Sequence, residues 1–197
     1  LSVDKQLPWG AGMGGGSSDA ASTLLALNRL WGLGWPGERL ATIGLALGAD
    51  VPFFVGGHHA FVEGIGERLT PLALPTLQFA VVKPPRAVAT RDIFGHPLLR
   101  RDSKPVILSG SLEEGGCTQG VAAPAAWWQG PGEAFGTNDL QPAAEDRCPE
   151  VAQAAEWLRV RFGNSRMTGS GSAVFSRVGT EASPMATFPA DELPAGW

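Results

Sequence analysis

The sequence predicts an α+β fold of two lobes, with residues 1–73 in the N-terminal lobe and residues 74–197 in the C-terminal lobe. Apolar residues recur at helical spacing in residues 19–31 and 150–162, as on the buried face of a helix. Strand-like runs on either side of a Gly-Ile-Gly turn at residues 64–66 indicate a β-hairpin. Prolines on both sides of the division support it as a boundary between the lobes.

Composition excludes several classes of protein. Of the 197 residues, 44% are hydrophobic and 17% are charged, which is typical of a folded soluble protein with one substantial core or two small domains. No apolar run approaches the ~20 residues that span a bilayer, and residues 1–5 do not resemble a signal peptide. We therefore expect a cytoplasmic protein without a membrane partner, whose Cys117 and Cys148 are reduced. The net charge of −4 and the scattered Lys and Arg argue against nucleic-acid binding.

In the N-terminal lobe the residues predict a strand end and three helical segments. Residues 1–3 have the character of a strand end, and a glycine-rich loop comes after them. One helix is expected over residues 19–31 and a second around residues 40–47, each closed by a glycine. Pro52 permits a new helical turn after Asp50 but not a central strand.

In the C-terminal lobe the residues predict two strands separated by a helix. Residues 77–82 form an apolar strand. Residues 150–162 form the helix, whose buried face is expected to carry Val151, Ala154, Ala155, Leu158 and Phe162. A glycine-rich turn at residues 168–172 leads into the last strand, residues 173–178. Residues 100–135 carry no clear period and are interrupted by Gly and Pro, so they are expected to be a loop or an insertion.

The segment Pro8–Ser18 is the strongest candidate for chemistry, because it holds five glycines between Gly10 and Gly16 and runs directly into a helix. Glycines let backbone N–H groups crowd around a phosphate, and the helix N-terminus adds further donors and a positive dipole end. Ser17 and Ser18 offer hydroxyls to phosphate or Mg²⁺, and either could instead cap the helix. A flexible linker is the alternative, but its position between a strand and a helix argues against it.

Other phosphate-binding motifs fit this loop poorly. The spacing of Gly10, Gly12 and Gly15 matches the dinucleotide-binding fingerprint. That fingerprint needs a strand with a terminal acidic residue about 20 positions later, where this sequence predicts a second helix. The P-loop requires a lysine after its last glycine, and none follows Gly16. The further motifs of protein kinases are also absent.

The whole string Pro8–Ala21 resembles the phosphate motif of the GHMP kinases. Residues 138–142 (Asn-Asp-Leu-Gln-Pro) and 166–173 resemble further motifs of the same family, and the similarity covers residues 3–98 and 135–178. The resemblance implies a two-lobed GHMP kinase fold that uses ATP and Mg²⁺ to phosphorylate a small-molecule alcohol. It is sharpest with members that phosphorylate the C2 hydroxyl of a cytidylated methylerythritol in non-mevalonate isoprenoid biosynthesis. The alternatives are a GHMP kinase of the homoserine or mevalonate type, or a non-catalytic nucleotide-binding fragment.

The resemblance also implies roles for individual residues. Asp50 is expected to take the proton from the acceptor hydroxyl; its alternative role is that of a helix N-cap. Thr90 and Phe94 align with residues that contact the cytidine end, with Phe94 stacking on the pyrimidine or, alternatively, belonging to the core. The expected ATP-binding residues are Pro8, Gly10, Gly12, Met13, Gly14, Gly15, Gly16, Ser17 and Ser18, backed by a turn at Gly169, Ser170 and Gly171. A simple tight turn is the alternative for that last segment, and no residue is expected to be a dedicated metal ligand.

The sequence departs from the family in one large respect. The family's opening section, with a catalytic lysine and a Tyr-His pair at the cytidine, has no counterpart here, and the chain contains no Tyr at all. The resemblance therefore implies a fragment without its N-terminal section, inactive alone.

Overall fold

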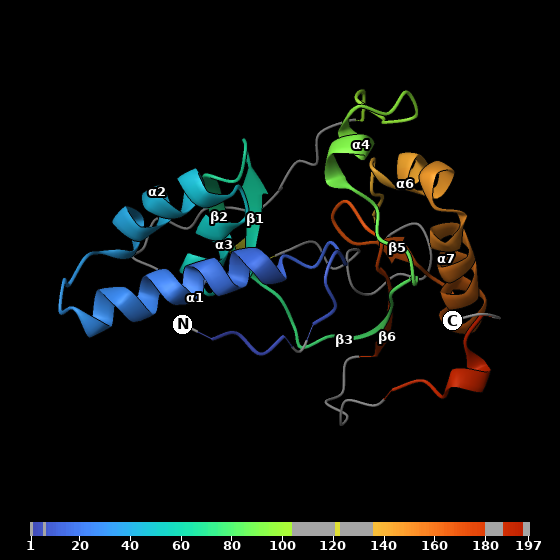
Figure 1. Cartoon of the computed structure of the whole chain (residues 1–197), viewed down its shortest axis with the longest axis horizontal. Coiled ribbons are helices and arrows are strands. Elements are labelled where there is room, and N and C mark those ends of the chain that lie inside the picture. The colour runs from blue at the N-terminus through green and yellow to red at the C-terminus, as the bar shows by residue number, and fades with distance from the viewer. Residues whose placement is uncertain (1, 6, 104–120, 123–135, 180–186, 195–197) are drawn as a thin grey trace. The chain divides into compact units, whose positions relative to one another are not determined.

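The computed structural model describes residues 2–5, 7–103, 121–122, 136–179 and 187–194. They form two compact units (Figure 1). The first unit holds the described parts of residues 1–5, 14–74 and 108–123, and the second holds those of 6–13, 75–107 and 124–197. The chain thus passes into the first unit after Met13 and leaves it after Leu74. Residues 7–13, which the sequence places in the N-terminal lobe, belong to the second unit because they pair with its backbone.

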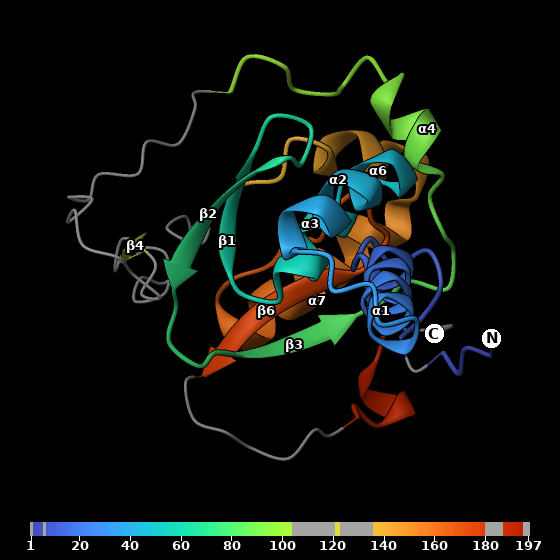
Figure 2. The same cartoon turned by 90° about the vertical axis from the view of Figure 1, so that its left-hand side faces the viewer.

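The first unit is a group of three helices with a small sheet. The helices pack against one another (Figure 2), and the strands pair in the order β1-β2-β4. β1 and β2 form the predicted antiparallel hairpin, with Ala60 opposite Pro71, and β2 pairs with β4 in parallel. The elements are α1 (Gly15–Leu30), α2 (Gly37–Leu47), α3 (Val51–Gly56), β1 (Ala60–Glu63), β2 (Arg68–Ala73) and β4 (Val121–Ala122).

Helix α1 begins four residues earlier than its apolar periodicity predicts. Its N-cap is Gly14, with φ 67°, so the helix takes in the last glycines of the loop and both serines. Neither Ser17 nor Ser18 caps it, because both already lie inside the helix. Its other end is fixed by Asn28, whose side chain accepts the Trp35 N–H and donates to the Trp35 carbonyl at 3.0 and 3.1 Å.

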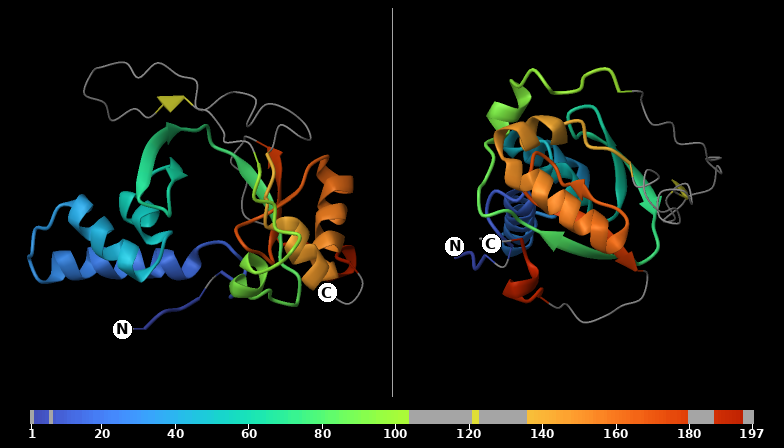
Figure 3. Two further views of the ribbon diagram at one scale, coloured as in Figure 1. Left: turned by 90° about the horizontal axis from the view of Figure 1, so that it is seen from above. Right: turned by 90° about the vertical axis from the view of Figure 1, so that its right-hand side faces the viewer.

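The second unit is an antiparallel sheet of order β3-β6-β5, covered by helix α7, against which α6 packs (both orange in Figure 3). In the first unit, by contrast, residues 2–5 contain no strand, so the strand end predicted at residues 1–3 is not seen in the described part of that segment. Most of residues 100–135 lie outside the described residues. The elements are β3 (Gln78–Val82), α4 (Thr90–Phe94), α6 (Gln141–Arg147), α7 (Pro149–Phe162), β5 (Arg166–Met167), β6 (Val174–Gly179) and the 3₁₀-helix η2 (Ala190–Glu192).

The core of the second unit forms where α7 packs on the sheet. The buried face of α7 carries Val151, Ala154, Ala155 and Leu158, four of the five positions that the helical spacing predicts; the fifth, Phe162, packs at the edge of the cluster. Cys148 is buried at the start of α7, and its thiol donates to a Glu150 carboxylate oxygen at 3.2 Å. Burial is the main reason that the pKa of this thiol is raised, so the thiol stays protonated to higher pH than a free cysteine.

These elements confirm the α+β class. Among the described residues, no helix combines the length and the apolar character that crossing a bilayer requires.

Truncating Leu158 to Ala should destabilise the second unit by about 2–5 kcal/mol, the usual cost of an empty space left by a buried leucine. Leu158 is fully buried in the core cluster, whereas Val160 on the same helix is 74% exposed. Val160→Ala is therefore the matched control and should change stability by less than about 0.5 kcal/mol. Urea unfolding followed by far-UV circular dichroism measures both. Equal effects of the two variants would contradict this description of the core.

Candidate functional site

In the second unit, the first part of the glycine-rich loop is bound to the turn between β5 and β6. The carbonyls of Gly10 and Ala11 accept the N–H groups of Ser172 and Ala173, each at 3.2 Å. The Thr168 hydroxyl donates to the carbonyl of the next residue in the loop at 3.0 Å. Three successive loop carbonyls therefore face the turn.

This pairing fixes the direction of the loop amides. In a trans peptide the N–H points opposite to the carbonyl of the same peptide unit, and the peptide bonds that follow Gly10, Ala11 and Gly12 are trans. The N–H groups of Ala11, Gly12 and Met13 therefore point away from the turn. Successive amides directed to one side are the arrangement that binds anions through the backbone.

Gly12 serves packing rather than ligand access. A Cβ at this position would overlap the Thr168 carbonyl oxygen and would lie 2.8 and 2.9 Å from the backbone N and O of Gly171. Only a glycine lets the loop approach the turn this closely. Of the other loop residues in this unit, Pro8 is exposed and Met13 is half-buried.

In the first unit, the second part of the loop forms the N-terminus of α1. The first hydrogen bond of the helix runs from the Ser18 N–H to the Gly14 carbonyl at 2.9 Å, so the amides of Gly15, Gly16 and Ser17 have no acceptor inside the helix. A Cβ added at Gly15 or Gly16 would meet no atom within 4 Å apart from its chain neighbours and the backbone of its own helix. Open space, orphan donors and the positive end of the helix dipole together favour an anion here.

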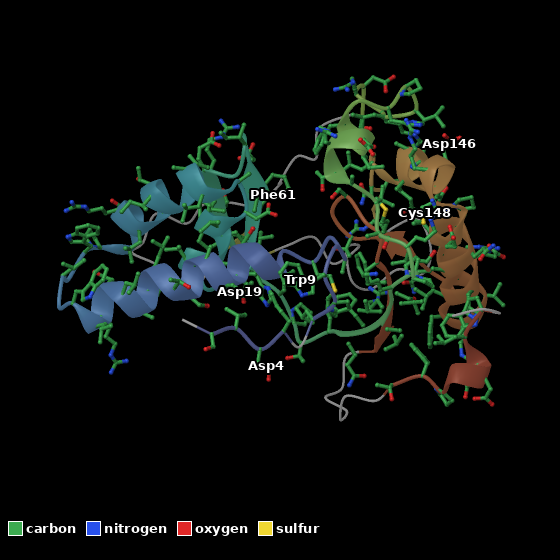
Figure 4. All side chains as sticks on the ribbon, viewed as in Figure 1. Asp4, Trp9, Asp19, Phe61, Asp146 and Cys148 are labelled. Carbon is green, nitrogen blue, oxygen red and sulfur yellow. The ribbon has the colours of Figure 1, made fainter. Side chains whose placement is uncertain are left out.

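Lys5 adds a cation to this end of α1. Its ammonium group donates to the carboxylate of Asp19 (labelled in Figure 4) in an ion pair. The two side chains are 25% and 40% exposed. Sequence reasoning did not single out either residue. Only their positions on both sides of the glycine-rich loop could have suggested that they meet.

Asp50 occupies the N-cap position of α3 but does not cap it with its side chain. The residue is exposed, so its carboxylate is directed to solvent rather than used to terminate the helix. Its backbone position is set by the β1–β2 hairpin, because Gly66 lies so close to the carbonyl of Ala49 that a side chain there would overlap it. The alternative role of a side-chain cap is therefore not what the structure shows.

Thr90 and Phe94 lie on α4 in the second unit. Phe94 is 53% exposed while its neighbour Ile93 is fully buried, so Phe94 is not a core residue. Arg101 holds the end of this helix by donating to the Phe94 carbonyl at 2.8 Å. The Thr90 hydroxyl lies 2.8 Å from that of Ser170, which brings the two predicted sites of this unit together.

The turn that contains Gly169, Ser170 and Gly171 is more than a simple reversal between β5 and β6. The Gly171 N–H closes it on the Thr168 carbonyl at 3.0 Å, and its other groups contact the loop and α4. Two residues after the end of α4, the buried ring of His96 places Nε2 3.2 Å from the carboxylate of Asp146, which is labelled in Figure 4. Within the described residues, no cluster of three His, Cys, Asp or Glu side chains is arranged around a possible metal position.

Comparison with known proteins places the chain in a class. The sequence model of the GHMP kinases N terminal domain matches residues 1–58, and that of the GHMP kinases C terminal domain matches residues 126–185. The chain belongs to the GHMP kinase family.

Within the family the chain is similar to one particular kind of kinase. It is 54% identical, over its whole length and 63% of the relative, to the 4-diphosphocytidyl-2-C-methyl-D-erythritol kinase of Methylibium petroleiphilum strain PM1. It is 50% identical to the protein of that name from Polaromonas naphthalenivorans, over 92% of the chain and 57% of the relative. A crystal structure of 4-(cytidine 5'-diphospho)-2C-methyl-D-erythritol kinase matches the chain with a TM-score of 0.67 and 35% sequence identity. The match covers 89% of this chain and 59% of the chain in the crystal structure. The chain thus spans about three fifths of these proteins.

Two glycine substitutions should separate anion binding from folding. Gly16→Ala adds a methyl group that meets no protein atom, so it should leave the melting temperature unchanged or raise it while weakening ATP binding about tenfold or more. Gly14→Ala, by contrast, forces a side chain into a positive φ and to 2.8 Å from the Phe54 ring, and it should lower the melting temperature. Calorimetric titration with ATP and thermal unfolding measure the two effects. Unchanged ATP affinity in Gly16→Ala would remove the helix N-terminus from the candidate site.

Proposed function

We propose that the chain carries the nucleotide-binding and acceptor-activating parts of a kinase for 4-diphosphocytidyl-2-C-methyl-D-erythritol. The reaction transfers the γ-phosphoryl group of ATP to the C2 hydroxyl of that substrate, in cytoplasmic non-mevalonate isoprenoid biosynthesis. The proposal rests mainly on the N-terminus of α1. There the first backbone amides have no acceptor inside the helix, and the space beside Gly15 and Gly16 is open. The names of the similar proteins support this substrate over those of the other GHMP kinases.

Backbone groups are proposed to bind the ATP phosphates. The amides of Ala11–Met13 and of Gly15–Ser17 would donate to phosphate oxygens, which explains how a chain of net charge −4 can bind a polyanion. The described residues offer Mg²⁺ the hydroxyls of Ser17 and Ser18 but no cluster of carboxylates, so the ion would take most of its ligands from phosphate and water. When bound, Mg²⁺ would neutralise charge on the transferred phosphoryl group.

Asp50 is proposed as the general base. Its carboxylate is exposed and makes no cap, so it can accept a hydrogen bond from an approaching hydroxyl. As the acceptor oxygen bonds to the γ-phosphorus and the bond to the leaving ADP breaks, the hydroxyl proton passes to this carboxylate.

Phe94 and Thr90 are proposed to bind the cytidine end of the substrate. The exposed ring of Phe94 provides an apolar face on which a pyrimidine can stack. Thr90 presents a hydroxyl beside it, already in hydrogen-bond contact with Ser170.

A direct assay distinguishes a kinase from a non-catalytic nucleotide-binding fragment. ADP release is followed with ATP and the cytidylated acceptor, for the chain alone and for the chain joined to the part of the Methylibium relative that lies outside the match. Acceptor-dependent ADP release in the joined protein supports the proposal. Turnover with homoserine or mevalonate instead would point to another GHMP kinase, and ATP binding without any turnover would leave only a nucleotide-binding module.

Replacing Asp50 by Asn should lower kcat about 10²-fold or more, because the amide cannot accept the proton. ATP affinity should barely change, since backbone amides bind the phosphates. Glu38→Gln is the matched control: it removes one exposed carboxylate from the same unit, at the first turn of α2, and should leave kcat unchanged. Steady-state kinetics of the joined protein measures both variants. Near-normal turnover of Asp50→Asn would show that this carboxylate is not the base.

A further inference from the structure

We infer that Asn138 and Thr168 are positioning residues that hold the loop Gly10–Met13 in its anion-binding geometry. The inference deepens the proposed function, because it assigns a role to the Asn-Asp-Leu-Gln-Pro motif at residues 138–142. Neither residue needs to touch ATP. Both would act through the backbone of the loop.

The side chain of Asn138 bridges the carbonyls of the two residues that flank Thr168. Its amide nitrogen donates to the Met167 carbonyl and to the Gly169 carbonyl, both at 2.8 Å. Its amide oxygen accepts the Leu140 N–H at 3.0 Å. Asn138 thereby donates both of its amide hydrogens to backbone carbonyls. A carboxylate of the same shape has no hydrogen to donate and would place an oxygen against these carbonyls.

A second side chain of the motif strengthens the same attachment. Gln141 accepts the Met167 N–H at 2.9 Å, so Met167 is held by its N–H through one motif residue and by its carbonyl through another. The Met167 side chain is itself buried in the core. The segment that leads into Thr168 is therefore fixed on a rigid part of the unit.

Thr168 connects the segment held by Asn138 and Gln141 to the loop. Its backbone N–H donates to the Ala173 carbonyl at 3.0 Å, and its hydroxyl donates to the Gly12 carbonyl at 3.0 Å. The Gly12 carbonyl belongs to the peptide unit whose N–H is that of Met13. Fixing this carbonyl on the turn therefore fixes the Met13 amide on the opposite side, where an anion would bind.

Thr168→Val tests the hydrogen bond from Thr168 to the Gly12 carbonyl. It keeps the shape of the side chain but removes the hydroxyl that donates to Gly12, and the loss of one such bond should weaken ATP binding about fivefold to tenfold. Thr168→Ser restores the hydroxyl and should restore most of the affinity. A Val variant that binds ATP like the unmodified chain would overturn the inference.

Asn138→Asp tests the hydrogen bonds from Asn138 to the Met167 and Gly169 carbonyls, and Asn164→Asp is its matched control. Asn164 also donates to two backbone carbonyls, those of Phe162 and Arg177 at 3.0 and 3.1 Å, and its Oδ1 also accepts a backbone N–H. Both variants put carboxylate oxygens against carbonyl oxygens in the same unit, so both should lower the melting temperature. Only Asn138→Asp should also weaken ATP binding, by about tenfold. Equal losses of affinity would show that Asn138 acts through general stability alone.

Amide hydrogen exchange of the full 197-residue chain without nucleotide separates this inference from the proposed function. The N–H groups of Ser172 and Ala173 donate to the loop, so Thr168→Val and Asn138→Asp should speed their exchange about tenfold. Asn164→Asp, which loses donations to the Phe162 and Arg177 carbonyls instead, should leave the exchange rates of Ser172 and Ala173 unchanged. If the unmodified chain binds no ATP, the proposed function fails, yet these exchange rates still decide whether the loop is held in this way. Unchanged rates at Ser172 and Ala173 would overturn the inference.

Discussion

Three carbonyl groups of the glycine-rich loop, those of Gly10, Ala11 and Gly12, determine what the loop can do. Because each accepts a hydrogen bond from residues 168–173, the amides that follow them must face the other way. An anion site made of backbone donors has no side chains to orient it. Its geometry depends on whatever holds the carbonyls, and here that is the turn between β5 and β6.

The glycines of the loop do not all serve the same purpose. At position 12 the missing side chain allows two backbone segments to touch, whereas at positions 15 and 16 it leaves open space over the first amides of α1. The first kind of glycine is needed whether or not a ligand is present. The second kind makes no such contact and leaves the first amides of α1 accessible, which supports the proposed phosphate site.

Much of the fold and part of the site could be predicted from the sequence. The hairpin around residues 64–66 and the buried face of α7 follow from periodicity, which depends only on neighbouring residues. The start of α1 was predicted too late, because the first turn of a helix needs no apolar side chains and glycines carry no periodic signal.

The packing role of Gly12 could not be predicted, since its partner Thr168 is 156 residues away in the chain. Asn138 belongs to the Asn-Asp-Leu-Gln-Pro motif, but the spacing of residues in the sequence does not indicate its hydrogen bonds to the backbone 29 and 31 residues later. The roles of Asp50, Thr90 and Phe94 came from resemblance and stay predictions, although the exposure of Phe94 shows that it is not a core residue.

The pairing of residues 10–12 with residues 172–173 also bears on how the protein is made. The loop leaves the ribosome about 160 residues before Ser172 and Ala173, whose N–H groups donate to it. Helix α1 can form from its own local contacts while translation continues, but the loop that precedes it must wait. Until Ala173 has emerged, the nascent chain has no means of ordering residues 10–12 as they are in the finished protein.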